Sequence, residues 1–211
     1  MRGSLKVATS GSEPEDVGSI PTPAAMEDQE KTIIKIADVA EFEYQTEQFF
    51  KQVVPHFQGS NRENILNYLI AELGDNIKQH SQSKKAVLDF SPRNQELADL
   101  IISDGGIGIG SSFRKAGLDV NDQEAIKLAL RGRSTKKEGN RGWGLRTVAA
   151  IVLKLKASLE ISSGNARAIV EANKPIFMKV PNRKGTTISL VLPKKIEIPD
   201  KIFYDILEGE K

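Results

Sequence analysis

The residues best suited to chemistry lie on one predicted helix in the first half of the chain. At 3.6 residues per turn, Glu72, Asn76 and Gln79 fall on one stripe of this helix. Asp75 lies beside the stripe and His80 at its margin. A carboxylate one turn before an amide suits a general base next to a magnesium ligand, because Mg²⁺ takes oxygen donors and keeps several waters. The same pattern standing alone is also typical of a solvated helix face.

A glycine-rich run follows the predicted buried strand that ends at Ser103. Asp104 opens the run, and Gly105, Gly106, Gly108 and Gly110 follow it. Glycines at this density indicate unusual φ angles or a close approach of the backbone to another group. An aspartate at a strand end can accept a hydrogen bond from an exocyclic amine such as that of adenine. A plain tight turn after a strand is the alternative.

A second glycine turn opens an apolar helix, with Gly142, Trp143, Gly144 and Leu145 at its start. Such a turn presents backbone N–H groups and the positive end of the helix dipole, which together suit a phosphate group. The loop before it is rich in polar and basic residues, and a loop of this kind can close over phosphates as a lid. Its charges also fit a solvated loop, and Trp143 also fits a core or interface aromatic.

Two familiar nucleotide motifs are absent from the sequence. No Gly, four residues, Gly, Lys, Ser/Thr arrangement occurs, so a P-loop is excluded. The dinucleotide fingerprint needs a third glycine where this chain has Ser111 or Phe113, and Asp104 lies on the wrong side of the glycines to hold a ribose.

The elements that must position these motifs follow from apolar periodicity. Helices are expected at about 38–57, 61–81, 122–130 and 143–156, and strands at 32–36, 85–90, 96–103, 158–163, 166–172 and 186–192. The strands at 85–90 and 96–103 are expected to form a hairpin, and Gly164 with Asn165 to turn the strand at 158–163 into the next. Helices first, with strands interspersed afterwards, predict an α+β sandwich of two layers, in which helices cover one face of a mixed sheet.

Composition limits the classes of protein. The 211 residues are enough for one main domain, and an apolar fraction of 39% with a charged fraction of 27% is ordinary for a globular protein. A net charge of +2 makes nucleic acid an unlikely partner, and the apolar stretch at 148–155 is too short to span a bilayer. The absence of cysteine excludes disulfides and thiolate zinc sites. A cytoplasmic protein that does not enter the membrane is expected.

Residues 1–30 are rich in Gly, Ser, Pro and Glu and are interpreted as a disordered tail or an upstream extension. They lack the apolar block of a signal peptide. Residues 31–193 are expected to form the main domain. Residues 194–211 are expected to form a short amphipathic C-terminal extension.

The three motifs, in this order and spacing, resemble those of the GHKL superfamily of ATPases, which includes the catalytic domains of histidine kinases. The segment 72–80 resembles the N box of that superfamily, 104–109 its first glycine box and 142–145 its second. The resemblance covers about residues 32–193. It implies a histidine kinase-like ATP-binding domain with the Bergerat-type two-layer fold, and ATP with Mg²⁺ as its ligands.

Carried over by position, the resemblance implies that Asn76 is the Mg²⁺ ligand and that Glu72 is the general base. Asp104 resembles the carboxylate that recognises the adenine amino group. The other implied nucleotide-binding residues lie in the two glycine boxes and in a lid that spans 110–141. They are Gly106, Gly108, Ile109, Ser134, Thr135, Lys136, Lys137, Arg141, Gly142, Trp143, Gly144 and Leu145.

The chain departs from the pattern of many GHKL kinases at Gln79, where those kinases have a basic residue. Lys78 points to another helix face, which leaves the phosphate charge to Lys136, Lys137 or Arg141.

The only histidines are His56 and His80, and His56 lacks the acidic neighbour that is usual in a phosphoacceptor motif, which argues against a complete autophosphorylating kinase. The layout is similar to stand-alone anti-sigma-factor serine kinases and to small ATP-binding proteins that work beside a STAS-like partner.

The resemblance therefore implies a Mg-ATP-binding domain in bacterial signalling that hydrolyses ATP or transfers its γ-phosphoryl group to a partner protein. The alternative is a switch without catalysis, in which an ATP-ordered lid binds a regulatory, STAS-like partner. ATP and ADP are the expected small ligands, and a homodimer is left open.

Overall fold

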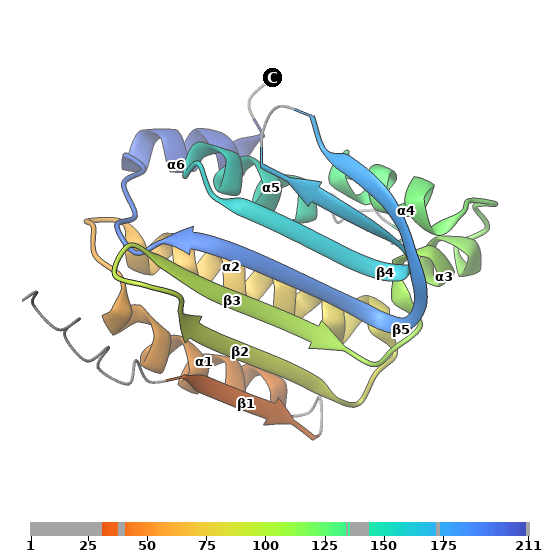
Figure 1. Cartoon of the computed structure of the whole chain (residues 1–211), viewed down its shortest axis with the longest axis horizontal. Coiled ribbons are helices and arrows are strands. Elements are labelled where there is room, and N and C mark those ends of the chain that lie inside the picture. Colours follow the sequence, from red (N-terminus) through yellow and green to blue (C-terminus); the bar gives the residue numbers. More distant parts are fainter. Residues whose placement is uncertain (1–30, 38–40, 134, 136–143, 172–173, 210–211) are drawn as a thin grey trace, which may run out of the picture.

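The computed structural model of the chain describes residues 31–37, 41–133, 135, 144–171 and 174–209, and they form two layers (Figure 1). The predicted tail at 1–30 lies outside the described residues. Within them, one layer is a five-stranded sheet with the order β1-β2-β3-β5-β4. The strands are β1 (Thr32–Ile36), β2 (Ala86–Pro92), β3 (Leu97–Asp104), β4 (Ser158–Val170) and β5 (Ile176–Pro193).

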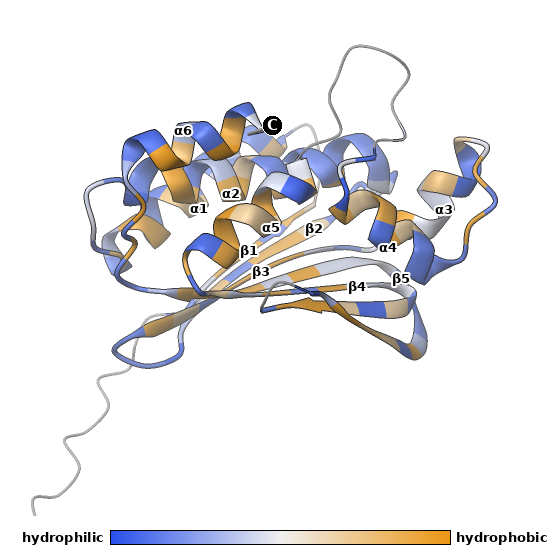
Figure 2. Cartoon of the chain, turned by 90° about the horizontal axis from the view of Figure 1, so that it is seen from above, coloured by the Kyte–Doolittle hydropathy of each residue, from blue (hydrophilic) through white to orange (hydrophobic). Residues whose placement is uncertain are grey.

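The helices lie on one side of this sheet (Figure 2). They are α1 (Phe42–Val53), the short 3-10 turn η2 (Val54–His56), α2 (Arg62–Asn76), the π-helical turn η3 (Ile77–Ser81), α3 (Gly108–Lys115), α4 (Asp122–Leu130), α5 (Gly144–Lys154) and α6 (Asp200–Glu208). This arrangement confirms the α+β class and the coverage of one sheet face. No helix in the described part of the chain combines the length and the apolar character needed to cross a bilayer.

The prediction of a mixed sheet is wrong, because each pair of neighbouring strands is antiparallel. The helices α1 and α2 lie between β1 and β2 in the sequence and return the chain in the opposite direction. Tight connections then make β2 with β3, and β4 with β5, into antiparallel hairpins. The order of helices and strands along the sequence therefore predicted the two layers correctly, but it did not determine the direction of each strand.

The predicted hairpin of β2 and β3 is confirmed, with a register that runs from Pro92 opposite Ala98 to Ala86 opposite Asp104. The turn is closed by the N–H groups of Arg93 and Asn94, which both donate to the carbonyl oxygen of Leu97. This register delivers Asp104 to the end of β3, where the glycine-rich run begins.

The predicted turn at Gly164 and Asn165 is wrong, because β4 continues through both residues with a local register shift. Gly164 has a φ of +59°, and the N–H of Asn165 donates to Asp122 Oδ2 at 2.9 Å. Glycine in the left-handed region followed by asparagine suits a bulge as well as a turn. The Asp122 carboxylate, which sits at the start of α4, stabilises the bulge.

The core lies between the helices and the covered sheet face, and the predicted apolar stripes supply it. On α2 and η3 the buried residues include Ile65, Leu66, Leu69, Leu73 and Ile77, and on α5 and just after it they include Leu145, Val148, Ala149, Val152 and Leu155.

The segment after residue 193 joins the same core through three buried side chains, Ile196, Ile198 and Phe203. Its backbone is tied to the segment before α2, because Gln58 forms a parallel bridge with Lys195. The chain from 194 to 209 therefore packs on the domain, whereas the boundary at 193 stays a prediction.

Candidate functional site

One cavity of about 300 Å³ lies between α2, η3, α3, α5 and the inner strands. It is bordered by residues from all three sequence motifs, which are Glu72, Asn76, Asp104, Gly108, Ile109, Gly144 and Leu145, and by Thr135 from the predicted lid. The predicted site residues Ser134, Lys136, Lys137, Arg141, Gly142 and Trp143 lie outside the described residues. The three motifs are far apart in sequence, so their meeting at one cavity is a result of the fold.

The polar stripe predicted on α2 faces this cavity. Glu72, Asp75, Asn76, Gln79 and His80 all border it. The helix changes at its end from α2 into the wider π-helical turn η3. Such wide turns are often found at functional sites, because they alter the directions of the side chains within one helix.

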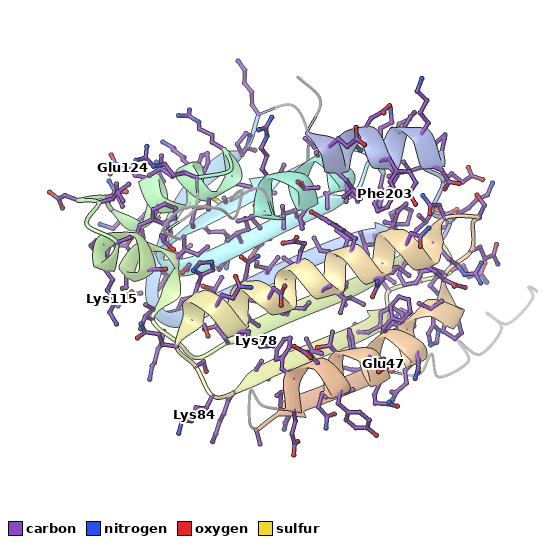
Figure 3. All side chains as sticks on the ribbon, turned by 180° about the vertical axis from the view of Figure 1, so that it is seen from behind. Glu47, Lys78, Lys84, Lys115, Glu124 and Phe203 are labelled. Carbon is purple, nitrogen blue, oxygen red and sulfur yellow. The ribbon has the colours of Figure 1, made fainter. Side chains whose placement is uncertain are left out.

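Lys78 points away from the cavity, as the sequence predicts. Its ammonium group pairs with the carboxylate of Glu43 on α1. Figure 3 shows Lys78 on the helical side of the molecule. The pair raises the pKa of Lys78 and lowers the pKa of Glu43. Lys78 is therefore held by its ion pair with α1. Of the two neighbouring residues Lys78 and Gln79, only Gln79 borders the cavity.

The first residue of α5 packs directly against the polar face of α2. A Cβ atom placed on Gly144 would overlap with Glu72 Oε2 and lie 3.9 Å from Asn76 Nδ2. Only glycine leaves room for the carboxylate here. The Glu72 carboxylate and the Asn76 amide therefore lie close to the N-terminal end of α5, which favours negative charge.

Asp104 contributes a half-buried carboxylate to the cavity. Burial raises the pKa of Asp104, against the lowering effect of backbone N–H groups from Gly106 and Thr186. The N–H of Gly106 donates to Asp104 Oδ1 at 2.7 Å. These hydrogen bonds hold the carboxylate in one orientation at the end of β3.

Gly106 does not border the cavity, and packing explains why a glycine is required at this position. A Cβ atom at this position would overlap with the carbonyl oxygen of Ser81. The neighbouring N–H of Ile107 donates to that same oxygen at 2.8 Å. These contacts fasten the glycine loop to the end of η3.

The helix α3 was not predicted from the sequence. It begins at Gly108, which has a φ of +77°, and continues through the rest of the glycine run. Its first turn is anchored by Ser163 of β4, whose Oγ accepts from the N–H of Ile109 at 2.8 Å. Ser163 is fully buried and also donates to the carbonyl oxygen of Gly185 at 3.2 Å.

Thr135 is the one described residue between 134 and 143, and it lies at the cavity. Its Oγ1 is 3.1 Å from His80 Nδ1 and 3.4 Å from Ser112 Oγ. These contacts connect the predicted lid region to η3 on one side and to α3 on the other.

Several cavity residues were not predicted from the sequence. Apolar walls come from Ile102 on β3, Ile188 on β5 and Phe113 on α3, and polar atoms from Ser112 and Thr186. The sequence predicted strands at 96–103 and 186–192, which contain Ile102 and Ile188, but did not show that these side chains border a cavity. Mixed apolar walls with a few converging polar groups are typical of small-molecule sites.

The described residues do not form a closed metal site. Among them, no group of three or more His, Cys, Asp or Glu side chains could hold a metal ion. Asn76 offers an amide oxygen in a half-buried position. A magnesium ion that is bound partly by water and by phosphate oxygens needs only one or two ligands from the protein.

Comparisons with known proteins add no family assignment. A scan against protein-family models and a search of the curated proteins each found no match for this sequence.

Proposed function

We propose that this chain is a Mg-ATP-binding domain of the GHKL type with a Bergerat-type fold, which hydrolyses ATP or transfers its γ-phosphoryl group to a partner protein. The observation that carries the proposal is the meeting of the three motifs at one cavity. Glu72 and Asn76 come from the helix α2, Asp104 from the end of β3, and Gly144 from the start of α5.

The cavity walls suit the two chemical halves of a nucleotide. Ile102 and Ile188 offer buried apolar surface beside Asp104, which fits a flat base with an exocyclic amine. The start of α5 at Gly144 offers backbone N–H groups and the positive end of the helix dipole, which fit phosphate oxygens. The base is assigned to the Asp104 side and the phosphates to the side of Asn76 and Gly144.

Asn76 is the residue that would hold magnesium. Its neighbours suit this role, because the Gly144 backbone at the start of α5 approaches it closely enough for a phosphate to lie against both. The magnesium ion, when bound, supplies positive charge that stabilises the phosphate oxygens during transfer.

Glu72 is assigned the role of general base. Its carboxylate accepts a proton from a water molecule whose oxygen attacks the γ-phosphorus. The bond from that phosphorus to the β–γ bridging oxygen breaks, and its electron pair leaves with ADP. In phosphotransfer, a serine or threonine hydroxyl of a partner, which we propose is STAS-like, takes the place of the water.

The test compares phosphate release from Mg-ATP by the wild type and by Glu72→Gln. The amide keeps the shape of the side chain but cannot accept the proton, so release is expected to fall by about 100-fold or more while Mg-ATP binding persists. Glu63→Gln is the matched control, because Glu63 is an exposed glutamate on the same helix.

Three possible results decide between an enzyme and a switch without catalysis. Binding in all three proteins with release lost only in Glu72→Gln supports the enzyme. Binding with equally negligible release from wild type and Glu72→Gln supports the switch. Absence of Mg-ATP and Mg-ADP binding by the wild type contradicts both.

A further inference from the structure

Three polar side chains from neighbouring strands form a row at one end of the covered sheet face. They are Asp104 of β3, Thr186 of β5 and Ser163 of β4, and we call them the polar row. Thr186 and Ser163 are direct cross-strand partners. The antiparallel register that ends with Ser103 opposite Thr187 brings Asp104 beside Thr186.

The polar row faces the helices, and this follows from its neighbours in the sheet. Two residues away along each strand lie three buried isoleucines, which are Ile102, Ile188 and Ile161. Side chains two residues apart on a strand share a face, so both rows point into the space between the layers. Asp104 and Thr186 border the cavity, and the fully buried Ser163 lies behind Thr186.

The Ser163 hydroxyl has three partners, and their chemistry fixes the direction of each hydrogen bond. A serine hydroxyl offers one proton and two lone pairs. The carbonyl oxygen of Gly185, at 3.2 Å, takes the proton, and the N–H of Ile109, at 2.8 Å, uses one lone pair. Thr186 Oγ1 lies 3.2 Å from Ser163 Oγ, so the Thr186 hydroxyl donates to the second lone pair.

This pattern decides what Thr186 can offer to a ligand in the cavity. Its single proton is used by Ser163, so its oxygen is left with acceptor capacity alone. An ionised Asp104 carboxylate likewise only accepts. The part of the polar row that borders the cavity therefore presents acceptors side by side.

Ser163 also joins two segments of the cavity wall that are not regular strand. Gly108 begins α3 with a φ of +77°, and a Cβ atom there would lie 2.8 Å from Ser163 Oγ. Gly185 has a φ of +75°, and a Cβ atom there would overlap with the carbonyl oxygen of Asp104. The glycines let both segments approach closely, and the Ser163 hydroxyl binds one backbone group of each segment.

We propose that Ser163 is a positioning residue that determines base specificity, because it makes the Asp104 end of the cavity accept hydrogen bonds without donating them. The inference rests on the proposed function and deepens it. Adenine presents an amino group, which donates, where guanine presents the oxygen O6, which accepts. An end that only accepts selects the amino group and leaves a carbonyl oxygen without a donor.

Removal of the Ser163 hydroxyl is expected to reduce this selection. In Ser163→Ala the Thr186 hydroxyl loses its acceptor and is free to turn its proton toward the cavity, where it can donate to guanine O6. The start of α3 and the Gly185 segment lose the group that joins them. The affinity for Mg-ATP therefore falls, and the affinity for Mg-GTP falls less or rises.

The experiment is calorimetric titration of the wild type, Ser163→Ala and Ser162→Ala with Mg-ATP and with Mg-GTP. The ratio of the Kd for Mg-GTP to the Kd for Mg-ATP is expected to fall by about fivefold or more in Ser163→Ala.

Ser162→Ala is the matched control. Ser162 is the preceding residue of β4 and is also buried, but its hydroxyl contacts Glu160 and Arg167 on the other face of the sheet. Its ratio of Kd values should equal that of the wild type.

Mg-tripolyphosphate, which has no base, separates a change at the Asp104 end from a general loss of binding. Its Kd is expected to stay within about twofold of the wild-type value in both variants, because the phosphate side of the cavity is distant from the change. A matching loss of affinity for tripolyphosphate and Mg-ATP in Ser163→Ala would overturn the inference.

Two further measurements keep the inference testable if Ser163→Ala does not fold. Ser163→Cys retains a weak donor and acceptor at the same place, so its ratio of Kd values should lie between those of Ser162→Ala and a protein without selection. Amide hydrogen exchange of Ile109 should be faster in the Ser163 variants than in the wild type and unchanged in Ser162→Ala.

The outcomes separate this inference from the proposed function. A folded Ser163→Ala or Ser163→Cys with the wild-type ratio of Kd values overturns the inference alone, as does an equal change of the ratio in Ser162→Ala. A wild type that binds neither Mg-ATP nor Mg-GTP overturns the proposed function and the base specificity with it. Binding of Mg-ATP with a ratio that falls only in the Ser163 variants supports both.

Discussion

The carboxyl group of Asp104 is partly buried, and burial disfavours its ionised form. Its pKa is raised by burial, so the folded protein binds a proton there more readily than the unfolded chain does. A raised pKa means that the stability contributed by the protonated group is present at low pH and is lost as the pH rises through the folded pKa. Keeping the ionised form at neutral pH therefore destabilises the fold, as is common for groups at binding sites.

Asp104→Asn is accordingly expected to increase thermal stability at pH 7, while it weakens binding of Mg-ATP by about tenfold or more. The amide oxygen can still accept the N–H of Gly106, and no charge remains to be buried. Melting curves from pH 3 to pH 8 check the sign, since the Tm advantage should shrink as the pH falls. An Asn variant that is less stable than the wild type at pH 7 would contradict the account.

Gly144→Ala tests the contact between α5 and Glu72. Alanine favours the helix, but its Cβ would overlap with Glu72 Oε2 and must displace that flexible carboxylate. We expect a Tm close to that of the wild type and a phosphate-release rate lower by about tenfold or more. Lys154→Ala, at the other end of α5, controls for changes to the helix. An unchanged release rate in Gly144→Ala would show that the Glu72 position is not important.

At the scale of elements, the bulge in β4 depends on a single glycine. Gly164 has a φ of +59°, and a Cβ there would overlap with the carboxylate of Asp122. Gly164→Ala is expected to lower the free energy of unfolding by about 2–4 kcal/mol through backbone strain and the displaced carboxylate. Urea denaturation measures this loss.

Gly117→Ala is the matched control for that prediction. Gly117 has a φ of +87° but open space around its Cβ position, so alanine there carries the backbone strain alone. The loss of stability should therefore be smaller than for Gly164→Ala. Equal losses would mean that the packing of Asp122 on the bulge contributes nothing.

The elements with a strong apolar period were predictable, and those decided by distant partners were not. The helix α4 matches its predicted range of 122–130, and the stripe of α2 has the expected buried residues. In contrast, α3 begins in glycines of low helix propensity. It depends on Ser163, which lies 54 residues after Ile109 in the chain and accepts a hydrogen bond from its N–H group. The bulge of β4 depends in the same way on Asp122. A single sequence does not reveal such partners.

At the scale of the whole molecule, the fold explains why three weak motifs form one site. The hairpin register brings Asp104 to the end of β3, and α2 and α5 cross the same sheet face with Glu72 and Gly144 in contact. The motif residues were predictable because their types and spacing are unusual. Thr186 and Ile188 were not, because they belong to an ordinary strand pattern and border the cavity only through the strand order.

The C-terminal helix should contribute to the stability of the whole domain. Phe203→Leu removes the ring that packs edge-on against Tyr68 of α2 and leaves a partly filled space, so we expect a loss of about 1–3 kcal/mol in the free energy of unfolding. Urea denaturation measures this loss. Ile202→Leu, on the same helix, is the control for repacking. A Phe203→Leu variant that is as stable as the wild type would contradict this contribution of α6.

The most direct test of the central claim is calorimetric titration of the protein with ATP, with and without Mg²⁺. We expect the wild type to bind Mg-ATP, and Asn76→Ala to lose about tenfold or more of that affinity while its affinity for ATP without magnesium changes little. Asn67→Ala, an exposed asparagine on the same helix, should bind like the wild type. No binding of Mg-ATP by the wild type, or equal affinities in wild type and Asn76→Ala, would contradict the account.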